Sequence, residues 1–132
     1  MFLSDPEVQS EYEIVIVDTA PSKGPLTISA IKAATHVIIP SVMEPLPVQG
    51  IYGMLQLWME ESLSRETERP LNLIGVLPNM WCNHKLHIDL YNSLLANKNL
   101  AEYIIPLKLG KRTLFAQVDA EEANPRSIFD LT

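Results

Sequence analysis

Runs of apolar, mostly branched residues are the feature that most constrains how this chain can fold. They occupy residues 13–18, 35–41 and 71–78, and a weaker run occupies residues 101–106. Continuous apolar runs are typical of strands covered on both faces, whereas strands with one wet face alternate apolar and polar residues. The runs therefore predict a sheet that is buried between layers of helices.

Helical patterns separate these runs. Residues 47–67 carry apolar side chains at the spacing of one helix face, at Val48, Ile51, Tyr52, Leu55, Trp58 and Met59. Residues 26–34, after Pro25, and residues 85–97 are expected to form two more helices. A short helix is also expected after Leu114, with Phe115 and Val118 turned inward.

Strands of the buried type that alternate with helices imply crossover connections between parallel neighbours. The predicted fold class is therefore α/β, with a mostly parallel sheet and flanking helices. A chain of 132 residues is long enough for one hydrophobic core, so we expect residues 1–132 to form a single domain.

Charge and cysteine content narrow the classes of function. The formal net charge is −6, so the whole chain is not a polyanion binder by charge alone, although a local basic patch remains possible. Cys82 is the only cysteine, which excludes an intrachain disulfide and favours a reducing compartment. The start of the chain does not resemble a signal peptide, and no run of eighteen apolar residues suggests a membrane span. We expect a cytoplasmic location.

Asp18 ends the first apolar run, and a turn marked by Pro21 and Gly24 follows it. Ligands of open parallel sheets bind at the carboxyl ends of the strands. A carboxylate there can hold Mg²⁺, usually through water, or orient a water molecule beside a phosphate. From this motif alone, a carboxylate that merely caps the turn is an equally good interpretation.

The longer stretch "YEIVIVDTAPSKGPLTISAIKAATHVIIPSVMEPLPVQGI" resembles the second nucleotide-site segment of the ParA/MinD group of P-loop ATPases, and most closely ParA-type partition proteins. About forty residues keep one register with that family. "NLIGVLPNMW" resembles its third strand, and "YIIPLKLGKRTLFAQ" resembles its last strand and the basic segment after it. The fold implied is an incomplete P-loop NTPase fold of the SIMIBI type.

The resemblance also implies roles for particular residues. Asp18 would be the catalytic, magnesium-linked carboxylate, and Thr19, Pro21, Ser22 and Gly24 would belong to switch II, which senses the γ-phosphate. Asn79 would lie near the base of ATP. The basic residues Lys108, Lys111 and Arg112 would contact DNA without reading its sequence, although ordinary solvated charges are an equally good interpretation. Ala20, Ser29 and Val42 depart from the family pattern.

In the complete protein, the resemblance implies ATP and Mg²⁺ as cofactors, a homodimer, a ParB-like partner, nonspecific DNA and location on the nucleoid. Plasmid or chromosome partition would be the function. The carboxyl-terminal segment is too short and too acidic to form the amphipathic membrane helix that MinD relatives carry, so membrane binding is not expected.

The glycine-rich phosphate loop of the family is missing from these residues. Gly110-Lys111 is the only Gly-Lys pair, but Arg112 follows it and Ile105 occupies the first glycine position. In the P-loop fold a first strand would lie between residues 13–18 and 35–40. The favoured explanation is a carboxyl-terminal piece of a longer protein; direct pairing of the two strands, or a strand from another chain, are the alternatives. We expect weak or absent ATP binding by this chain alone.

Other functions stay open. A non-catalytic scaffold or interaction module derived from a ParA-like domain is the main alternative. A metal-cluster assembly ATPase is disfavoured because one cysteine supplies too few thiolates. Cys82, His84, His87 and Asp89 lie close in sequence and could bind zinc, but a surface loop that leads into a helix is the favoured interpretation.

Overall fold

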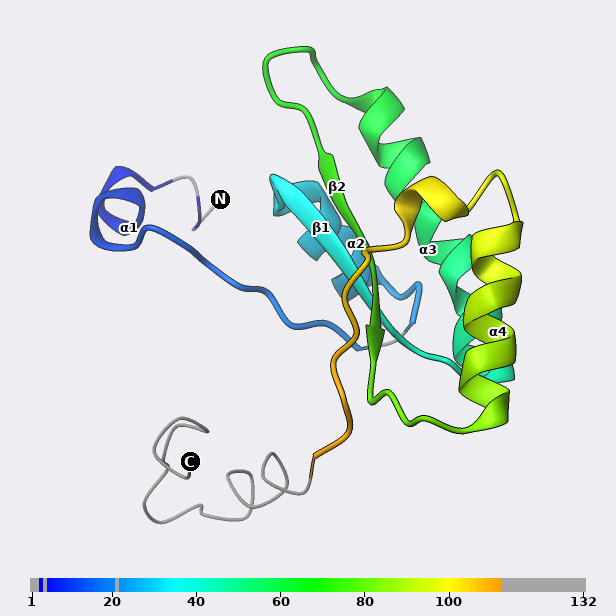
Figure 1. Ribbon diagram of the computed structural model, residues 1–132. Helices are drawn as coiled ribbons and strands as arrows, with labels where there is room; N and C mark the ends of the chain where they lie inside the picture. The colour runs from blue at the N-terminus through cyan, green and yellow to red at the C-terminus, as the bar shows by residue number, and fades with distance from the viewer. Residues whose placement is uncertain (1–2, 4, 21, 113–132) are drawn as a thin grey trace. The chain divides into compact units, whose positions relative to one another are not determined.

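The computed structural model describes residue 3, residues 5–20 and residues 22–112 (Figure 1). β1 and β2 form a two-stranded parallel sheet, and helices flank it, as expected for the α/β class. The elements in chain order are α1 (Pro6–Glu11), α2 (Pro25–Ala33), β1 (His36–Val42), α3 (Pro45–Ser64), β2 (Asn72–Asn79), α4 (Lys85–Ala96) and the 3₁₀ helix η2 (Ala101–Tyr103).

The structure confirms most of the predicted elements. β1 and β2 begin and end one residue later than expected, and α2, α3 and α4 occupy the predicted helical segments. α2 begins at Pro25, whose fixed φ suits the first helical position. The side chains along β1 alternate between exposed and buried, with Ile39 and Ser41 turned inward.

The chain divides into two compact units. Unit 1 comprises Met1–Val37 and Tyr52–Ile74, and unit 2 comprises Ile38–Ile51 and Gly75–Thr132. In unit 1 the indole Nε1 of Trp58 donates to the carbonyl oxygen of Leu71 at 3.0 Å, which ties α3 to the start of β2. Among the described residues of unit 2, the largest fully buried side chains are those of Met43, Ile51, Val76 and Pro78.

The predicted strand at residues 13–18 is not present. These residues form neither a strand nor a bridge with the described part of the chain, and they run as an extended segment between α1 and α2 (Figure 1). Ile14 is 78% exposed and Ile16 is 88% exposed. The physical reason is that an extended segment becomes a stable strand only with a hydrogen-bonded neighbour and a covered face.

The predicted strand at residues 101–106 is also largely wrong. Residues 101–103 form η2, and only Ile104 pairs with β2, through a parallel bridge to Val76. Ile105 N donates to the carbonyl oxygen of Val76 at 2.9 Å, so the segment follows β2 with sparse pairing. The helix expected after Leu114, with Phe115 and Val118, lies outside the described residues.

Candidate functional site

Asp18 lies near the end of the extended segment of unit 1, and its side chain is exposed. Thr19 and Ser22 are exposed as well, Gly24 is half-buried, and Pro21 lies outside the described residues. Ser22 N donates to the carbonyl oxygen of Ala20 at 2.7 Å, which makes a tight turn directly after the carboxylate. A ligand therefore has open access to Asp18 in this unit.

Thr27 fastens that turn to α2. Its side chain is buried, with 2% of its surface exposed, and its Oγ1 donates to the carbonyl oxygen of Ala20 at 3.4 Å. Ile31, one helical turn later, is buried on the same face. Thr27 lies in the stretch that resembles ParA-type proteins, but the sequence analysis assigned it no role. It could have been found as a hydroxyl residue four positions before the apolar Ile31, on the same face of a short helix.

Lys23, in the same turn, lies against α3. A Cβ atom built at Gly53 would lie 2.6 Å from Lys23 Cε and 2.8 Å from its Nζ, so the missing side chain of Gly53 leaves room for the lysine. Glycine inside a helix is unfavourable relative to alanine. Gly53 makes room for Lys23, a residue of the turn that follows Asp18. The sequence analysis did not predict this contact.

Asn79 is the last residue of β2, in unit 2. Its Oδ1 accepts a hydrogen bond from Met80 N at 2.8 Å, and Met80 has a positive φ of 49°. A positive φ is uncommon for a residue other than glycine, and it turns the chain sharply after the strand. The half-buried Asn79 side chain therefore shapes the loop at the carboxyl end of β2.

The basic residues lie beyond this loop in unit 2. Lys108, Lys111 and Arg112 are exposed. Lys111 N donates to the carbonyl oxygen of Trp81 at 3.1 Å, which holds the basic segment beside the loop that follows Asn79. The Nζ atom of Lys108 lies 4.3 Å from the centroid of the Trp81 ring and 4.1 Å from that of Tyr91.

His87 takes part in the structure of the same loop. Its side chain is 2% exposed, and its Nδ1 is 3.2 Å from Cys82 N, which donates to it. Burial lowers the pKa of His87 below its ordinary value of 6.5; the neighbouring His84 lowers this pKa further, and Glu44 opposes the shift. The neutral imidazole is therefore favoured, and one ring nitrogen already serves the backbone.

The described residues contain no group of three or more His, Cys, Asp or Glu side chains arranged to hold a metal ion. Asp18, as an exposed carboxylate, suits one hard-cation contact, because Mg²⁺ prefers oxygen ligands and often keeps several waters. One exposed carboxylate can supply one oxygen ligand and does not by itself form a metal site.

The structure brings some predicted site residues together within each unit. Unit 1 contains Asp18 and the turn that ends at Gly24, while unit 2 contains Asn79 and the basic segment. In the part of the chain that the structure describes, no helix is both long and apolar enough to cross a membrane.

Comparison with known proteins shows which family this chain resembles. The family described as AAA domain matches residues 5–71, which is 67 of the 132 residues and includes Asp18 and the turn after it. The chain is 36% identical to the chromosome-partitioning ATPase Soj of Thermus thermophilus over 70 residues, which cover 53% of this chain and 27% of Soj.

Two further relatives are similar to it. The cell division protein PomZ of Myxococcus xanthus is 26% identical over 116 residues, which cover 87% of this chain and 35% of PomZ. A ParA family protein of Chlamydia muridarum is 36% identical over 74 residues, which cover 56% of this chain and 28% of that protein. The chain thus spans about a third or less of the length of these relatives. Together, the AAA-domain match and these relatives show that the chain belongs to the ParA/MinD-type family of P-loop ATPases.

Proposed function

We propose that this chain is part of a ParA-like ATPase that partitions a chromosome or plasmid. The observation that supports it best is the family match over residues 5–71, a range that includes Asp18 and the turn after it. Open access to Asp18 supports the proposal, because a carboxylate that acts on a phosphate-bound ion or water must be reachable. The relatives Soj and PomZ have names that refer to chromosome partitioning and to cell division.

In the complete protein, Asp18 would hold Mg²⁺ through water, and Thr19, Pro21, Ser22 and Gly24 would respond to the γ-phosphate. Bound Mg²⁺ would supply charge stabilisation to the transferring phosphoryl group. Asn79 would lie near the base, as the resemblance to the family implies; its Oδ1 accepts a hydrogen bond from Met80 N in the loop after β2. The phosphate loop itself is not encoded in these 132 residues, so this chain alone is expected to bind ATP weakly or not at all.

The test uses the complete protein, with its phosphate loop, and the Asp18→Asn variant. Magnesium-dependent ATP turnover is expected in the parent protein and should fall by about 10²–10⁴-fold in the variant, because a positioned catalytic carboxylate contributes at that level. Asp89→Asn, which changes an exposed carboxylate on α4, is the matched control and should leave turnover unchanged. Equal turnover in all three proteins would contradict the role of Asp18.

Dimerisation, DNA binding and a ParB-like partner belong to the same proposal. The basic group formed by Lys108, Lys111 and Arg112 would face the DNA backbone in an ATP-bound homodimer on the nucleoid, within the cytoplasm. Such binding weakens steeply with salt, because cations of the protein displace counterions. Charge reversal at Lys111 and Arg112 in the complete protein should reduce DNA retention at low salt, and an unchanged salt titration would remove the basic group from the proposal.

A non-catalytic interaction module is the second candidate function. The observation that favours it is the exposed apolar segment at residues 13–18, which is open to pairing with another strand. The ATPase assay of the complete protein decides between the two candidates. If a protein with an intact phosphate loop forms stable assemblies and shows no turnover in any condition, the interaction module is the better description.

A further inference from the structure

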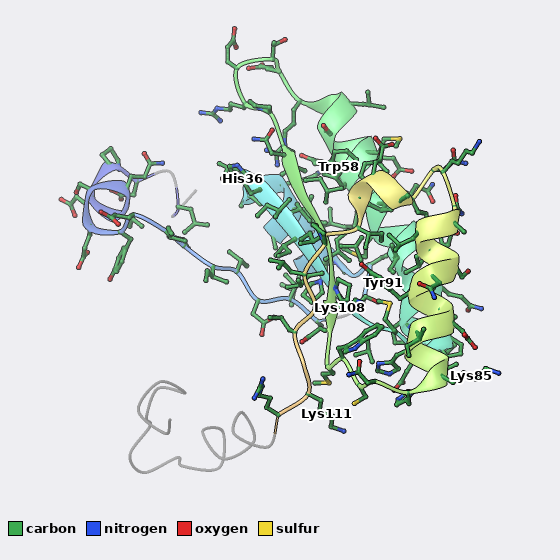
Figure 2. All side chains as sticks on the ribbon, in the orientation of Figure 1. His36, Trp58, Lys85, Tyr91, Lys108 and Lys111 are labelled. Atoms are coloured by element: carbon green, nitrogen blue, oxygen red, sulfur yellow. The ribbon has the colours of Figure 1, made fainter. Side chains whose placement is uncertain are left out.

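Lys108 makes contacts that set it apart from the other basic residues described in unit 2. Its Nζ lies within 4.3 Å of the centroids of two aromatic rings, those of Trp81 and Tyr91. Figure 2 labels Lys108 and Tyr91 in this region, with Lys111 farther along the chain. A cation within about 6 Å of a ring centroid is attracted by the negative ring face. The ammonium group of Lys108 is therefore held by the protein itself.

The two rings have contacts of their own. Trp81 meets Tyr91 edge-on, with ring centroids 5.5 Å apart, and it meets the buried His87 in the same manner at 5.6 Å. The indole Nε1 of Trp81 also donates to Asn83 Oδ1 at 2.8 Å. Edge-on aromatic pairs are favourable beyond the area that they bury. The rings therefore form a fixed platform on which the side chain of Lys108 rests.

The backbone of Trp81 holds the same segment that carries Lys108. Trp81 N donates to the carbonyl oxygen of Leu109 at 2.8 Å, and Lys111 N donates to the carbonyl oxygen of Trp81 at 3.1 Å. A parallel bridge joins Trp81 to Gly110. Lys108 adds a side-chain attachment to these main-chain bonds. The backbone of Trp81 thus bonds to Leu109 and Lys111, the residues on both sides of Gly110. Lys111 and the following Arg112 are exposed cations.

We propose that Lys108 is a positioning residue, which fastens residues 107–112 to Trp81 and Tyr91 so that Lys111 and Arg112 face an anionic nucleic-acid backbone together. The inference rests on the proposed function, because it assigns the phosphate contacts to Lys111 and Arg112 and removes them from Lys108. Two cations on an ordered segment lose less conformational freedom on binding than two cations on a loose one. The platform therefore raises affinity without contacting the ligand.

The first test needs no nucleic acid and uses the 132-residue chain. The ε-methylene protons of Lys108 should resonate upfield of those of Lys98 in nuclear magnetic resonance spectra, because they lie over aromatic rings. Tyr91→Leu should move the Lys108 signals toward those of Lys98 and speed the hydrogen exchange of the Lys111 amide. Lys98→Met is the matched control and should change neither the Lys108 resonances nor the hydrogen exchange of the Lys111 amide. Unshifted Lys108 signals in the parent chain would overturn the platform.

The second test is a double-mutant cycle on the binding of duplex DNA by the complete protein. Lys108→Met and Tyr91→Leu should each weaken binding by about two- to fivefold, the range expected for an exposed cation–π contact. The double variant should lose less affinity than the product of the two single losses, because the contact between Lys108 and Tyr91 is already absent in each single variant. Tyr91→Leu removes no charge, so a shared effect cannot come from a lost phosphate contact. Independent, multiplicative losses would assign Lys108 to the DNA and overturn the inference.

Salt dependence supplies a further distinction. Lys111→Met should lower the slope of log affinity against log salt by about one, as expected when one phosphate contact is lost. Lys108→Met should leave that slope unchanged, and Lys108→Arg should restore affinity, since arginine also rests on aromatic faces. A slope reduced by Lys108→Met would contradict the positioning role. If the parent protein binds no DNA, the proposed DNA-binding function fails, and the resonance test still decides whether the platform exists.

Discussion

The guanidinium group of Arg65, just beyond α3, closes the carboxyl end of α2 at Ile31. Arg65 Nη2 donates to the carbonyl oxygen of Ile31 at 2.6 Å, and Nη1 donates to that of Ala34 at 2.8 Å. The last carbonyl groups of a helix have no partner within the helix. Arg65 satisfies them and is itself held by Glu61, whose Oε1 lies 3.2 Å from its Nε.

We expect Arg65→Met to lower the free energy of unfolding of the chain by about 2–3 kcal/mol, because hydrogen bonds to charged groups are stronger than neutral ones and the side chain is 12% exposed. Glu61→Gln is the control and should cost less than about 1 kcal/mol, as a single ion pair near the surface does. Urea unfolding followed by circular dichroism measures both. An Arg65→Met midpoint equal to that of Glu61→Gln would show that the capping bonds contribute little.

Gly75 stands inside β2 with a φ of 139°, a conformation that side chains other than glycine rarely adopt. A Cβ there would lie 2.7 Å from the carbonyl oxygen of Tyr103 and 2.8 Å from Ile105 Cγ1. Gly75→Ala should therefore destabilise the chain by about 2–4 kcal/mol through strain and backbone displacement.

Gly50 is the matched control for this substitution. It lies in α3, and nothing lies within 4 Å of a Cβ built there. Gly50→Ala should stabilise the chain by up to about 1 kcal/mol, because alanine is the better helix former. Thermal unfolding of the two variants should therefore shift in opposite directions. Equal shifts would mean that the approach of residues 103–105 to β2 is looser than the structure shows.

Thr27→Val removes the hydroxyl that donates to the Ala20 carbonyl oxygen and keeps the shape of the side chain. We expect the Ser22 amide, which donates to the same carbonyl group, to exchange its hydrogen several times faster, because the turn loses a bond of about 1 kcal/mol. Thr27→Ser should restore the protection. If Thr27→Val exchanges like the parent chain, the hydroxyl does not hold the turn after Asp18.

His87 predicts a specific pH dependence of stability. Its pKa in the folded chain is lowered below the ordinary 6.5, chiefly by burial, so the unfolded chain binds its proton first as the pH falls. Stability should therefore decline as the pH falls below about 6.5, and this contribution should level off once the folded chain is also protonated. Above about 6.5 both states are neutral at this residue, and His87 adds no slope.

His87→Asn tests this assignment, because asparagine keeps an acceptor for Cys82 N and does not titrate. Urea unfolding at about pH 7.5 and about pH 5 should show a smaller loss of stability for His87→Asn than for the parent chain. His36→Asn, at an exposed histidine of β1, serves as the comparison. A pH dependence unchanged by His87→Asn would place the titrating group elsewhere.

Local patterns predicted β1, β2 and the helices α2 to α4, because each of these segments carries its own periodicity and, at α2, a proline suited to the first turn. The register with ParA-type proteins identified the family, since about forty spaced residues constrain a match far more than one motif. The same register named Asp18 and Asn79 as site residues, and those assignments stay predictions.

Residues 13–18 show where the sequence was insufficient. Their composition favours a strand, but a strand forms only when a neighbouring strand is hydrogen-bonded to it. No described residue pairs with this segment. Residues 101–106 likewise became η2 and a single bridge. The resting place of Lys108 on Trp81 and the capping of α2 by Arg65 also depend on contacts between distant residues.

The sequence by itself determined the fold class and the order of most elements, because these follow from periodicity and local propensity, and its resemblance to ParA-type proteins indicated the family. Only the tertiary structure showed that the predicted strand at residues 13–18 does not form among the described residues. It also showed which hydroxyl holds the turn after Asp18 and which lysine contacts aromatic rings. The physical reason is that hydrogen bonds, ring contacts and burial between residues far apart along the chain leave no periodic trace in it.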